Sequence, residues 1–399
     1  MITLDEAKCF IDNGVTSLKP ALLPLLDSVG CALTCDIIAP INVPEFASSA
    51  MDGIAFKSMD LNGNGPWKLP IQETIAAGDY SRQPLKSGHA VKIMTGAPLP
   101  RGADTIMPVE YVTFVDGWAI FSRNAAGEDH VRPLGDDIKK GQILCKNGDI
   151  LKPVDLGVLA SLGMKDIEVI PRPRIMLLST GSEVIEPGVQ LNPGQIYDSN
   201  NVVLRALLAR DSHLFNPAKR VMKDDPEIVS AELSDCLEHY DIVITTGGVS
   251  MGDFDFIPQV VRKLGGEIVF HKVAIKPGKP VLLARFGSKW LLGLPGNPVS
   301  VIAGYHLFAR RVIGRLMGQA CSPRGRQTVL GCDVSVHGDR LCLVGAKFQE
   351  CAEGRVISFP SNRQKSNRLS SISGIDGFVF IDGGTKTVPA GSEVYAEWL

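Results

Sequence analysis

From residue 174 to about residue 318, short apolar runs alternate with segments that have a helical period, and this alternation limits the possible folds more than any other feature. Strands are expected at the apolar runs 174–180, 241–246, 267–271, 280–285 and 289–293, the last two joined by a hairpin at Gly287-Ser288. Helices are expected over 200–209, 226–239, 256–264 and 298–317. Strands that alternate with helices predict a mainly parallel, doubly wound α/β sheet.

Three of these helices begin after a residue that could cap them. Asp225 stands before Pro226, Asn297 stands before Pro298, and Asp255 stands before the helix expected from 256. Short polar side chains accept hydrogen bonds from the first N–H groups of a helix, and proline fits its first turn. Asp225 and Asp255 could be no more than caps, which is the alternative to the roles considered below.

The regions on either side of this segment have a different texture. Residues 1–40 open with a helical pattern, and residues 41–140 contain short strands and glycine turns. Residues 141–170 include LKPVDLGVLASLG, a short helix that could pack back on the first forty residues. After residue 319, short alternating segments with frequent Gly and Ser predict a small β-barrel or sandwich. A chain of 399 residues has room for about two to four domains.

Charge and cysteine content exclude several classes of partner. The formal net charge of -2 argues against a nucleic-acid-binding protein, which usually has a strongly basic surface. The nine cysteines include no CxxC pair, which is typical of a reducing cytosol and of neither a disulfide framework nor a zinc site. The first residues, MITLDEAKCF, are acidic where a signal peptide would be basic, and no apolar run is long enough for a membrane span. The sequence predicts a cytoplasmic protein.

Three loops follow expected strands at the edge where open α/β sheets bind ligands. They are STGSE (179–183), TTGGVSMGD (245–253) and GLPGNP (293–298). The adjacent glycines of the second loop allow a tight turn and a close approach to a ligand. The helix that follows offers backbone N–H groups to an anion, although a simple strand-to-helix turn is the plainer alternative.

A fourth segment, HKVAIKPGKP (271–280), brings Lys272, Lys276 and Lys279 close together in a chain that is nearly neutral overall. Its prolines and glycine fix the loop, which favours presentation of the ammonium groups to an anion over a merely solvated loop. Lysine binds phosphate as a point charge.

Carboxylates occupy the same loops and helix starts. These are Glu183, Asp224, Asp225, Asp253 and Asp255. A carboxylate repels a bound phosphate unless a cation bridges the two, and Mg²⁺ does so with one or two carboxylates plus phosphate oxygens. The residues therefore predict a site for a phosphorylated or pyrophosphorylated small molecule with a hard divalent cation.

Other familiar catalytic motifs are missing from the sequence. It has no GxxxxGK[ST] and no GxSxG, and GNG at 63–65 lacks the rest of a dinucleotide fingerprint. The seven histidines show no HxH or HExxH spacing, so a catalytic metal held by histidines is not expected.

Seven segments together resemble the molybdopterin molybdenumtransferases, the MoeA family, to which the C-terminal domain of gephyrin also belongs. They match in order as SAMDGIA (49–55), IMTGAPLPRGADTIMPVE (93–110), STGSE (179–183), GQIYDSNN (194–201), TTGGVSMGDFD (245–255), AIKPGKP (274–280) and GLPGNP (293–298). Ile54 departs from the pattern, because an aromatic residue usually follows the SAMDG run. The segment 362–378 is a looser match.

The resemblance implies a multidomain fold. The expected parts are an elongated helical connector (1–40 and 141–170), an inserted β domain (41–140), the α/β molybdopterin-binding domain (171–318) and a C-terminal β-barrel domain (319–399). It also implies a homodimer whose active site joins the α/β domain of one subunit to the inserted domain of the other. The implied reaction inserts molybdate into adenylylated molybdopterin and releases AMP, which completes the molybdenum cofactor.

The resemblance also implies roles for single residues. Gly247, Gly248, Ser250 and Lys279 would bind the pyrophosphate, and Lys272 and Lys276 would stabilise the charge that develops on it. Glu183, Asp224 and Asp255 would hold Mg²⁺, with the choice between Asp224 and Asp225 left open. Asp52 and Thr95 would come from the partner subunit. The molybdate side would be formed by Pro295, Gly296, Asn297 and Pro298, with oxyanion contacts from Arg363, Arg368, Ser370 and Ser371.

Two alternatives remain at this stage. One is a molybdopterin adenylyltransferase, whose single domain is similar to residues 174–318 and which could also be a partner of this protein. The long flanking regions count against that alternative. The other is a gephyrin-like scaffold, and the retained lysines, aspartates and glycines favour an enzyme over it.

Overall fold

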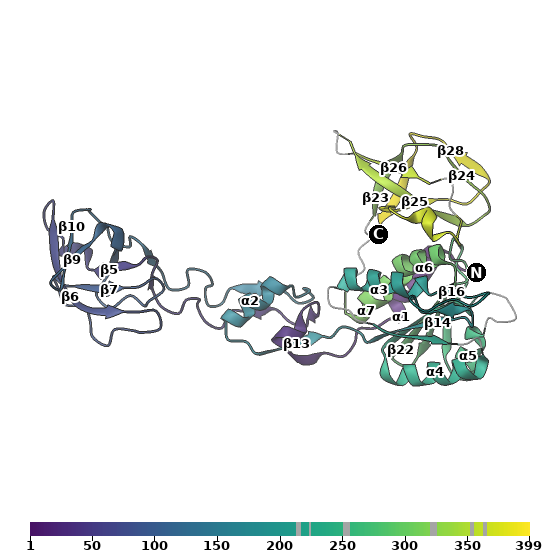
Figure 1. The fold of residues 1–399 in the computed structure, drawn as a ribbon, viewed down its shortest axis with the longest axis horizontal. Coiled ribbons are helices and arrows are strands. Elements are labelled where there is room, and N and C mark those ends of the chain that lie inside the picture. The colour runs from purple at the N-terminus through teal and green to yellow at the C-terminus, as the bar shows by residue number, and fades with distance from the viewer. Residues whose placement is uncertain (213–216, 223–224, 250–255, 320–324, 352–354, 362–364) are drawn as a thin grey trace. The chain divides into compact units, whose positions relative to one another are not determined.

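The protein is described here by a computed structural model that covers residues 1–212, 217–222, 225–249, 256–319, 325–351, 355–361 and 365–399. These residues form two compact units, each with its own hydrophobic core (Figure 1). The larger unit comprises residues 1–23, 28–34 and 168–399, and the smaller unit comprises residues 24–27 and 35–167. Within the covered ranges, no helix is both long and apolar enough to cross a membrane.

A six-stranded sheet forms the centre of the larger unit. Its strand order is β17 (Ala218–Met222), β14 (Ile175–Thr180), β18 (Ile242–Thr246), β22 (Lys289–Leu294), β21 (Leu282–Phe286) and β19 (Glu267–His271). The first four strands are parallel, and β21 and β19 are antiparallel to their neighbours. The mainly parallel sheet is thus confirmed. The edge strand β17 was not expected, because two of its five residues are charged, it has no long apolar run, and only Met222 is buried.

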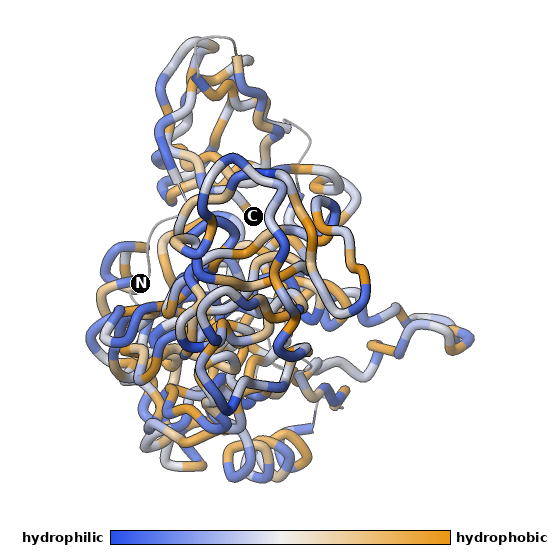
Figure 2. The backbone as a smooth tube through the Cα atoms, turned by 90° about the vertical axis from the view of Figure 1, so that its left-hand side faces the viewer, coloured by the Kyte–Doolittle hydropathy of each residue, from blue (hydrophilic) through white to orange (hydrophobic). Residues whose placement is uncertain are grey.

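Helices cover both faces of this sheet, so the larger unit has a doubly wound core of three layers. The helices are α1 (Leu4–Gly14), α3 (Ser199–Ser212), α6 (Pro298–Gly304) and α7 (Arg310–Leu316) on one face, and α4 (Pro226–His239) and α5 (Ile257–Lys263) on the other (Figure 1). Leu177 and Ile244 point to the first group, whereas their sequence neighbours Leu178 and Val243 point to the second. Figure 2 shows the hydropathy of each residue along the backbone, with hydrophobic and hydrophilic stretches interspersed.

The helix ends agree only in part with the sequence. The Asp225 carboxylate accepts hydrogen bonds from the N–H groups of Glu227 and Ile228 at 2.9 and 3.1 Å, so it caps α4 as predicted. Asn297 precedes α6, but its side chain forms no cap hydrogen bond and instead donates to Ser366 Oγ at 3.3 Å. The helix expected over 298–317 is interrupted by η4, a π-helical turn (Tyr305–Ala309).

The C-terminal part of the larger unit is a closed barrel. Its strands β25 (Leu341–Glu350), β26 (Val356–Pro360), β23 (Gly325–Leu330), β29 (Glu393–Trp398) and β27 (Gly377–Ile381) form a ring, because β27 also pairs with β25. A barrel is therefore the outcome, not a sandwich. A short strand of the lysine segment, β20 (Ile275–Lys276), pairs in parallel with β25.

The smaller unit contains a second six-stranded sheet. Its order is β8 (Thr105–Pro108), β5 (Gly53–Phe56), β7 (Ala90–Ile93), β6 (Trp67–Ile75), β10 (Trp118–Phe121) and β9 (Thr113–Val115). Ile54 is buried in its core beside Phe56 and Met107, so an aliphatic side chain fills the place where the resemblance expects an aromatic one. The helix expected in the connector is α2 (Pro153–Ser161).

The first helix, α1, belongs to the larger unit, where it packs against α7. Two compact units do not test the division into four domains, which stays a prediction. The remaining elements are short: β1 (Ala21–Pro24), η1 (Leu25–Ser28), β2 (Ala32–Leu33), β3 (Ile37–Ile38), β4 (Ser48–Ser49), η2 (Ser58–Asp60), η3 (Val109–Tyr111), β11 (Val131–Arg132), β12 (Ile143–Cys145), β13 (Asp166–Ile170), β15 (Val184–Ile185), β16 (Ile196–Tyr197), β24 (Val334–Val336), η5 (Leu369–Ile372) and β28 (Lys386–Val388).

Candidate functional site

A cavity of about 1380 Å³ opens at the carboxyl edge of the α/β sheet, within the larger unit. The ends of β14 and β18 and the loops 276–280 and 295–300 form one side of it. Residues 334–337 and 342–344, from the barrel, form another. The loops that the sequence predicts to bind a ligand therefore meet in one cavity.

The structure brings together about half of the predicted site residues. Those that line the cavity are Glu183, Gly248, Lys276, Lys279, Pro295, Gly296, Asn297 and Pro298. Those described but not among the lining residues are Gly247, Lys272, Arg368, Ser370 and Ser371. Asp224, Ser250, Asp253, Asp255 and Arg363 lie outside the described residues.

The two glycines of the second loop allow it to pack against its neighbours. Gly247 has φ of 92°, and a Cβ there would lie 2.6 Å from Thr180 Oγ1. Its N–H donates to the Leu294 carbonyl at 2.9 Å, which joins this loop to the GLPGNP loop. The fold therefore already uses that donor in this conformation, and the role of Gly247 in phosphate binding stays a prediction. Gly248, with φ of 66°, remains a lining residue.

Two lysines of the predicted trio reach the cavity. Lys276 and Lys279 are exposed lining residues, and Lys276 Nζ donates to the His337 carbonyl at 3.3 Å. Lys272 has φ of 73°, and its backbone pairs with Ile2 and Val281. Lys272 is not among the lining residues, so the three lysines do not meet in the cavity.

A buried polar floor lies under the cavity, and sequence reasoning assigned it no role. Asp198, which is 5% exposed, accepts hydrogen bonds from the backbone N–H and the side-chain amide of Asn201 at 3.0 and 2.9 Å. The same amide donates to Ser179 Oγ at 2.8 Å. Asn200 donates to the Gly296 carbonyl at 2.8 Å. The signal was the quoted motif GQIYDSNN, whose amides and carboxylate hold the cavity walls together.

The barrel contributes further lining residues that the sequence did not indicate, namely His337, Arg340 and Lys365. Arg340 Nη1 donates to the Ile275 carbonyl at 3.0 Å, so it also fixes the lysine segment. No local pattern could have found these residues, since pairing between β20 and β25 brings distant segments together. In the tail, Ser371 Oγ donates to the Arg368 carbonyl at 2.5 Å, which serves the local turn.

Of the carboxylates predicted to bind a divalent cation, only Glu183 lies within the described residues. Glu183 is an exposed carboxylate on the cavity wall, which is the hard oxygen ligand that Mg²⁺ prefers. Asp225 is used as a helix cap. Among the residues that the structure describes, no group of three or more His, Cys, Asp or Glu is arranged to hold a metal ion. Because Asp224 and Asp255 are not described, the magnesium site stays a prediction.

In the smaller unit, Asp52 and Thr95 form a pair. Asp52 Oδ1 accepts hydrogen bonds from the Thr95 N–H at 2.7 Å and from the Thr95 hydroxyl at 2.8 Å. The backbone hydrogen bond, and then the hydroxyl, hold the pKa of Asp52 below its usual range, although the carboxylate is fully exposed. The sequence placed both residues in one site, and the structure places them in contact.

Comparison with known proteins agrees with the resemblance. Residues 2–163 match the MoeA N-terminal region (domain I and II), and residues 176–315 match the family described as "Probable molybdopterin binding domain". The chain is 36% identical over 327 residues to molybdopterin molybdenumtransferase 2 of Mycobacterium tuberculosis, covering 80% of each protein. It is 30% identical over 397 residues to the molybdopterin molybdenumtransferase of Staphylococcus aureus, covering 98% of this chain and 94% of the relative.

A solved structure supports the same conclusion. The molybdopterin biosynthesis MoeA protein of Pyrococcus horikoshii superposes with a TM-score of 0.78 at 28% sequence identity, covering 100% of this chain and 99% of the other. The matched segments therefore span the whole chain and not only its α/β part. The chain belongs to the MoeA family of molybdopterin molybdenumtransferases, transferases that act in molybdenum cofactor biosynthesis.

Proposed function

We propose that this protein transfers molybdenum from molybdate to adenylylated molybdopterin and releases AMP. The observation that carries the proposal is the cavity at the carboxyl edge of the sheet, which Lys276 and Lys279 line together with the glycine loop and the GLPGNP loop. A cavity of about 1380 Å³ has room for a dinucleotide-sized ligand, given that pockets for drug-sized molecules measure roughly 300–1,000 Å³. Its lysines suit a pyrophosphate better than a neutral ligand.

In this proposal the protein stabilises charge at the bond that breaks. When the phosphoanhydride of the adenylylated pterin opens, negative charge grows on the phosphate oxygens. Lys276 and Lys279 would stabilise that charge, since fixed positive groups in a partly dry site act more strongly than in water. Lys272, with its backbone held by Ile2 and Val281, would supply a longer-range field. Gly248, together with Ser250, would let the backbone approach the phosphates.

The molybdate would occupy the opposite side of the cavity. Pro295, Gly296, Asn297 and Pro298 would form a wall whose position Asn200 fixes through Gly296. Oxyanion contacts are proposed from the segment that precedes β27, with Arg363, Arg368, Ser370 and Ser371 as candidates. Of these, the three described residues would have to turn toward the cavity when the oxyanion binds.

A divalent cation would be held by Glu183 with Asp224 and Asp255. When bound, it would neutralise phosphate oxygens that otherwise repel these carboxylates. We expect AMP release to stop in excess chelator and to return when Mg²⁺ is restored in excess. Full activity in chelator would contradict the assignment of Glu183 to a cation.

The complete site is proposed to need two subunits. Asp52 and Thr95 of the partner subunit would join the cavity formed by the α/β part and the barrel, as the resemblance implies for a homodimer. The exposed, ionised carboxylate of Asp52 would then face the bound substrate or its cation.

The deciding experiment incubates the purified protein with adenylylated molybdopterin, molybdate and Mg²⁺ and measures AMP and active cofactor. We expect both products, in equal amounts. If the protein instead makes adenylylated molybdopterin from molybdopterin and ATP, it is an adenylyltransferase, and the proposal is wrong. If a folded dimer carries out neither reaction, a scaffold role is favoured. The reaction is proposed for the cytoplasm, where an adenylyltransferase would be the expected partner.

A further inference from the structure

We propose that residues 2–14, here called the N-terminal strap, position the lysine segment of the cavity against the barrel, with Lys8 and Glu397 as positioning residues. The strap touches the lysine segment at one end and the barrel at the other. Its role in catalysis rests on the proposed function, whereas its mechanical role does not.

The first end of the strap pairs with the lysine segment itself. Ile2 forms an isolated parallel β-bridge with Val273. Its N–H donates to the Lys272 carbonyl at 3.1 Å, and its carbonyl accepts from the Ala274 N–H at 2.7 Å. These two bonds hold the backbone just before Lys276, so the direction of the lysine segment depends on where Ile2 lies.

A stable helix begins directly after this bridge. Thr3 and Glu6 form a capping box, in which the Glu6 N–H donates to Thr3 Oγ1 at 3.2 Å and the Thr3 N–H donates to Glu6 Oε2 at 2.7 Å. Leu4, Ala7 and Ile11 are buried along one face of α1. Because the cap and this face fix the helix, a displacement of α1 would also move Ile2.

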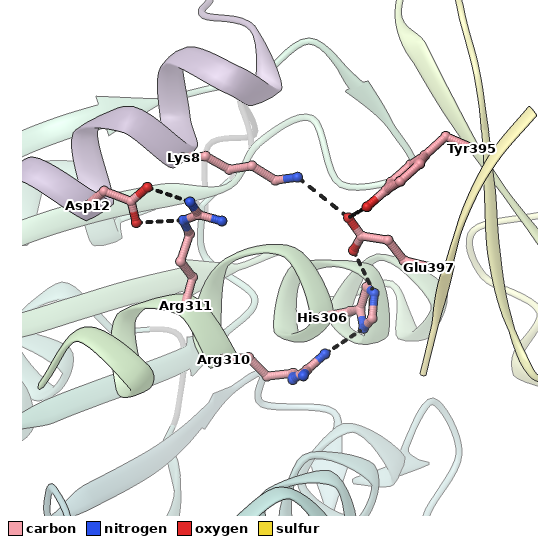
Figure 3. A network of polar contacts seen from close by, with 7 residues as sticks. All are labelled: Lys8, Asp12, His306, Arg310, Arg311, Tyr395 and Glu397. Atoms are coloured by element: carbon pink, nitrogen blue, oxygen red, sulfur yellow. Dashed lines mark hydrogen bonds and ion pairs between the residues drawn. The ribbon is translucent and has the colours of Figure 1, made fainter. Parts of the chain in front are cut away.

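The second end of the strap reaches a buried carboxylate on the barrel. Lys8 Nζ lies 3.6 Å from Glu397 Oε1, and Glu397 is 6% exposed. His306 Nε2, in the π-helical turn, lies 2.9 Å from Glu397 Oε2, and the Tyr395 hydroxyl donates to Oε1 at 3.3 Å. Figure 3 shows these side chains converging on Glu397 from α1, the π-helical turn and the barrel.

The proton on His306 can be assigned from its other neighbour. Arg310 Nη1 lies 3.3 Å from His306 Nδ1, and a guanidinium can only donate. Nδ1 therefore accepts, and Nε2 carries the hydrogen that faces Glu397. The approach of Nε2 to Glu397 is close but poorly aligned, so the attraction is mainly electrostatic.

Glu397 stays ionised in this environment. Burial alone would raise its pKa, but His306, Lys8 and Tyr395 more than offset burial, and the pKa lies below its usual range. A buried carboxylate without its partners is costly, so the barrel edge that carries Glu397 is held where Lys8 and His306 can reach it.

A hydrogen-bonded path completes the connection. Glu397 lies on β29, which pairs with β27, which pairs with β25. In turn, β25 pairs with β20, where Lys276 stands opposite Cys342. Lys276 is thus tied to Glu397 through the barrel and, by way of Ile2 and Lys8, through the strap. Asp12 anchors the strap on the helix side, where Arg311 Nε donates to Asp12 Oδ1 at 2.7 Å.

The test compares Lys8→Met with a matched ion pair that lies outside this connection. Lys263 on α5 and Glu227 on α4 form an ion pair at 2.9 Å with both side chains exposed, so Lys263→Met removes the same charge without touching the strap or the barrel. The direct readout is backbone hydrogen exchange over residues 272–276 in the absence of substrate. We expect roughly 10-fold faster exchange in Lys8→Met, since the Ala274 N–H loses its fixed acceptor. We expect no change in Lys263→Met, and wild-type protection in Lys8→Arg.

Kinetics then test the positioning role. We expect Lys8→Met to raise the KM for adenylylated molybdopterin by about 5- to 10-fold, with kcat changed less than about 2-fold, because a loosened lysine segment weakens binding first. Glu397→Gln should act in the same direction and more strongly. If that variant does not fold, Lys8→Met decides alone, because Lys8 is partly exposed and its loss leaves the core intact.

Unchanged exchange over 272–276 in Lys8→Met would overturn the proposal, as would a lower melting temperature without a change in KM, which indicates a merely structural contact. A wild-type protein that makes no AMP would end the proposed function instead. The exchange measurement would still decide whether the strap holds the lysine segment.

Discussion

The ionised carboxylates of the two units are stabilised in different ways. In the larger unit, Asp241 is buried and receives hydrogen bonds from Arg174 and from Lys289, whose Nζ lies 3.0 Å away. In the smaller unit, Asp52 is exposed, and Asp104 is held by the N–H and hydroxyl of Ser58 at 2.6 and 2.9 Å. All three have a pKa below the usual range, but only Asp241 is neutralised by the cations that hold it.

This difference separates carboxylates that serve the fold from carboxylates that can serve a ligand. A carboxylate neutralised by buried cations has little field left for a substrate. A carboxylate fixed by uncharged N–H and hydroxyl donors keeps its full charge and a fixed direction. Asp52 is both fixed and exposed, so it is the one of these three that a cation or a partner surface can reach.

The largest expected effect separates Asp52 from Asp104. We expect Asp52→Asn to lower AMP release by about 100-fold or more, because the proposed function places this charge next to the substrate or its cation. Its melting temperature should change little, since the side chain is exposed. Steady-state AMP release and thermal unfolding, measured on the same preparation, check both statements.

Asp104→Asn is the matched control in the same unit. The Asp104 carboxylate is partly buried and, like that of Asp52, accepts hydrogen bonds from uncharged N–H and hydroxyl donors. The variant should therefore lower the free energy of unfolding by about 1–3 kcal/mol and leave activity per folded molecule unchanged. Equal losses of activity in the two variants would mean that position in the unit, not exposure of charge, decides the effect.

Sequence patterns predicted the elements that a short stretch of residues is enough to identify. The strands of the α/β sheet were predictable because β14, β18 and β22 are buried on both faces and read as apolar runs. The Asp225 cap followed from its place before Pro226. The edge strand β17 escaped because an exposed edge carries polar side chains and has no apolar run.

The site was predictable as a set of loops but not as a set of contacts. The sequence named Lys276 and Glu183, which line the cavity, from the loop chemistry alone. It missed Arg340 because barrel pairing brings that residue to the lysine segment from far along the chain. It also did not indicate that the Gly247 N–H donates to the Leu294 carbonyl of the GLPGNP loop, because only tertiary packing brings these two loops together.

The second prediction tests whether Asp52 acts in the cavity of the other subunit of a dimer. Two inactive variants, Asp52→Ala and Lys276→Ala, are mixed, dissociated and reassembled. Random pairing makes about half of the dimers mixed, and a two-fold dimer has two equivalent sites. In each mixed dimer one site carries both lesions and the other carries none, so activity should return to roughly a quarter of wild type. No recovery, with mixed dimers confirmed by mass, would mean that each site is built within one chain.

The smallest expected effect concerns Asp241, the buried carboxylate, and the way its contribution to stability depends on pH. Burial opposes ionisation of Asp241, but hydrogen bonds from Arg174 and then Lys289 outweigh it, so its folded pKa is depressed. A carboxylate with a depressed pKa contributes stability that is fully present above the unfolded pKa of about 3.9 and is lost as pH falls through the folded pKa.

We expect Asp241→Asn to lower the free energy of unfolding by about 2 kcal/mol at neutral pH. Its urea midpoint should then begin to converge on that of wild type as pH falls below about 3.9, and it should converge fully only below the depressed folded pKa, where Asp241 itself becomes protonated. A difference that persists at low pH would show that Asp241 stabilises the larger unit through packing and neutral hydrogen bonds, and the contrast with the exposed charge of Asp52 would fail.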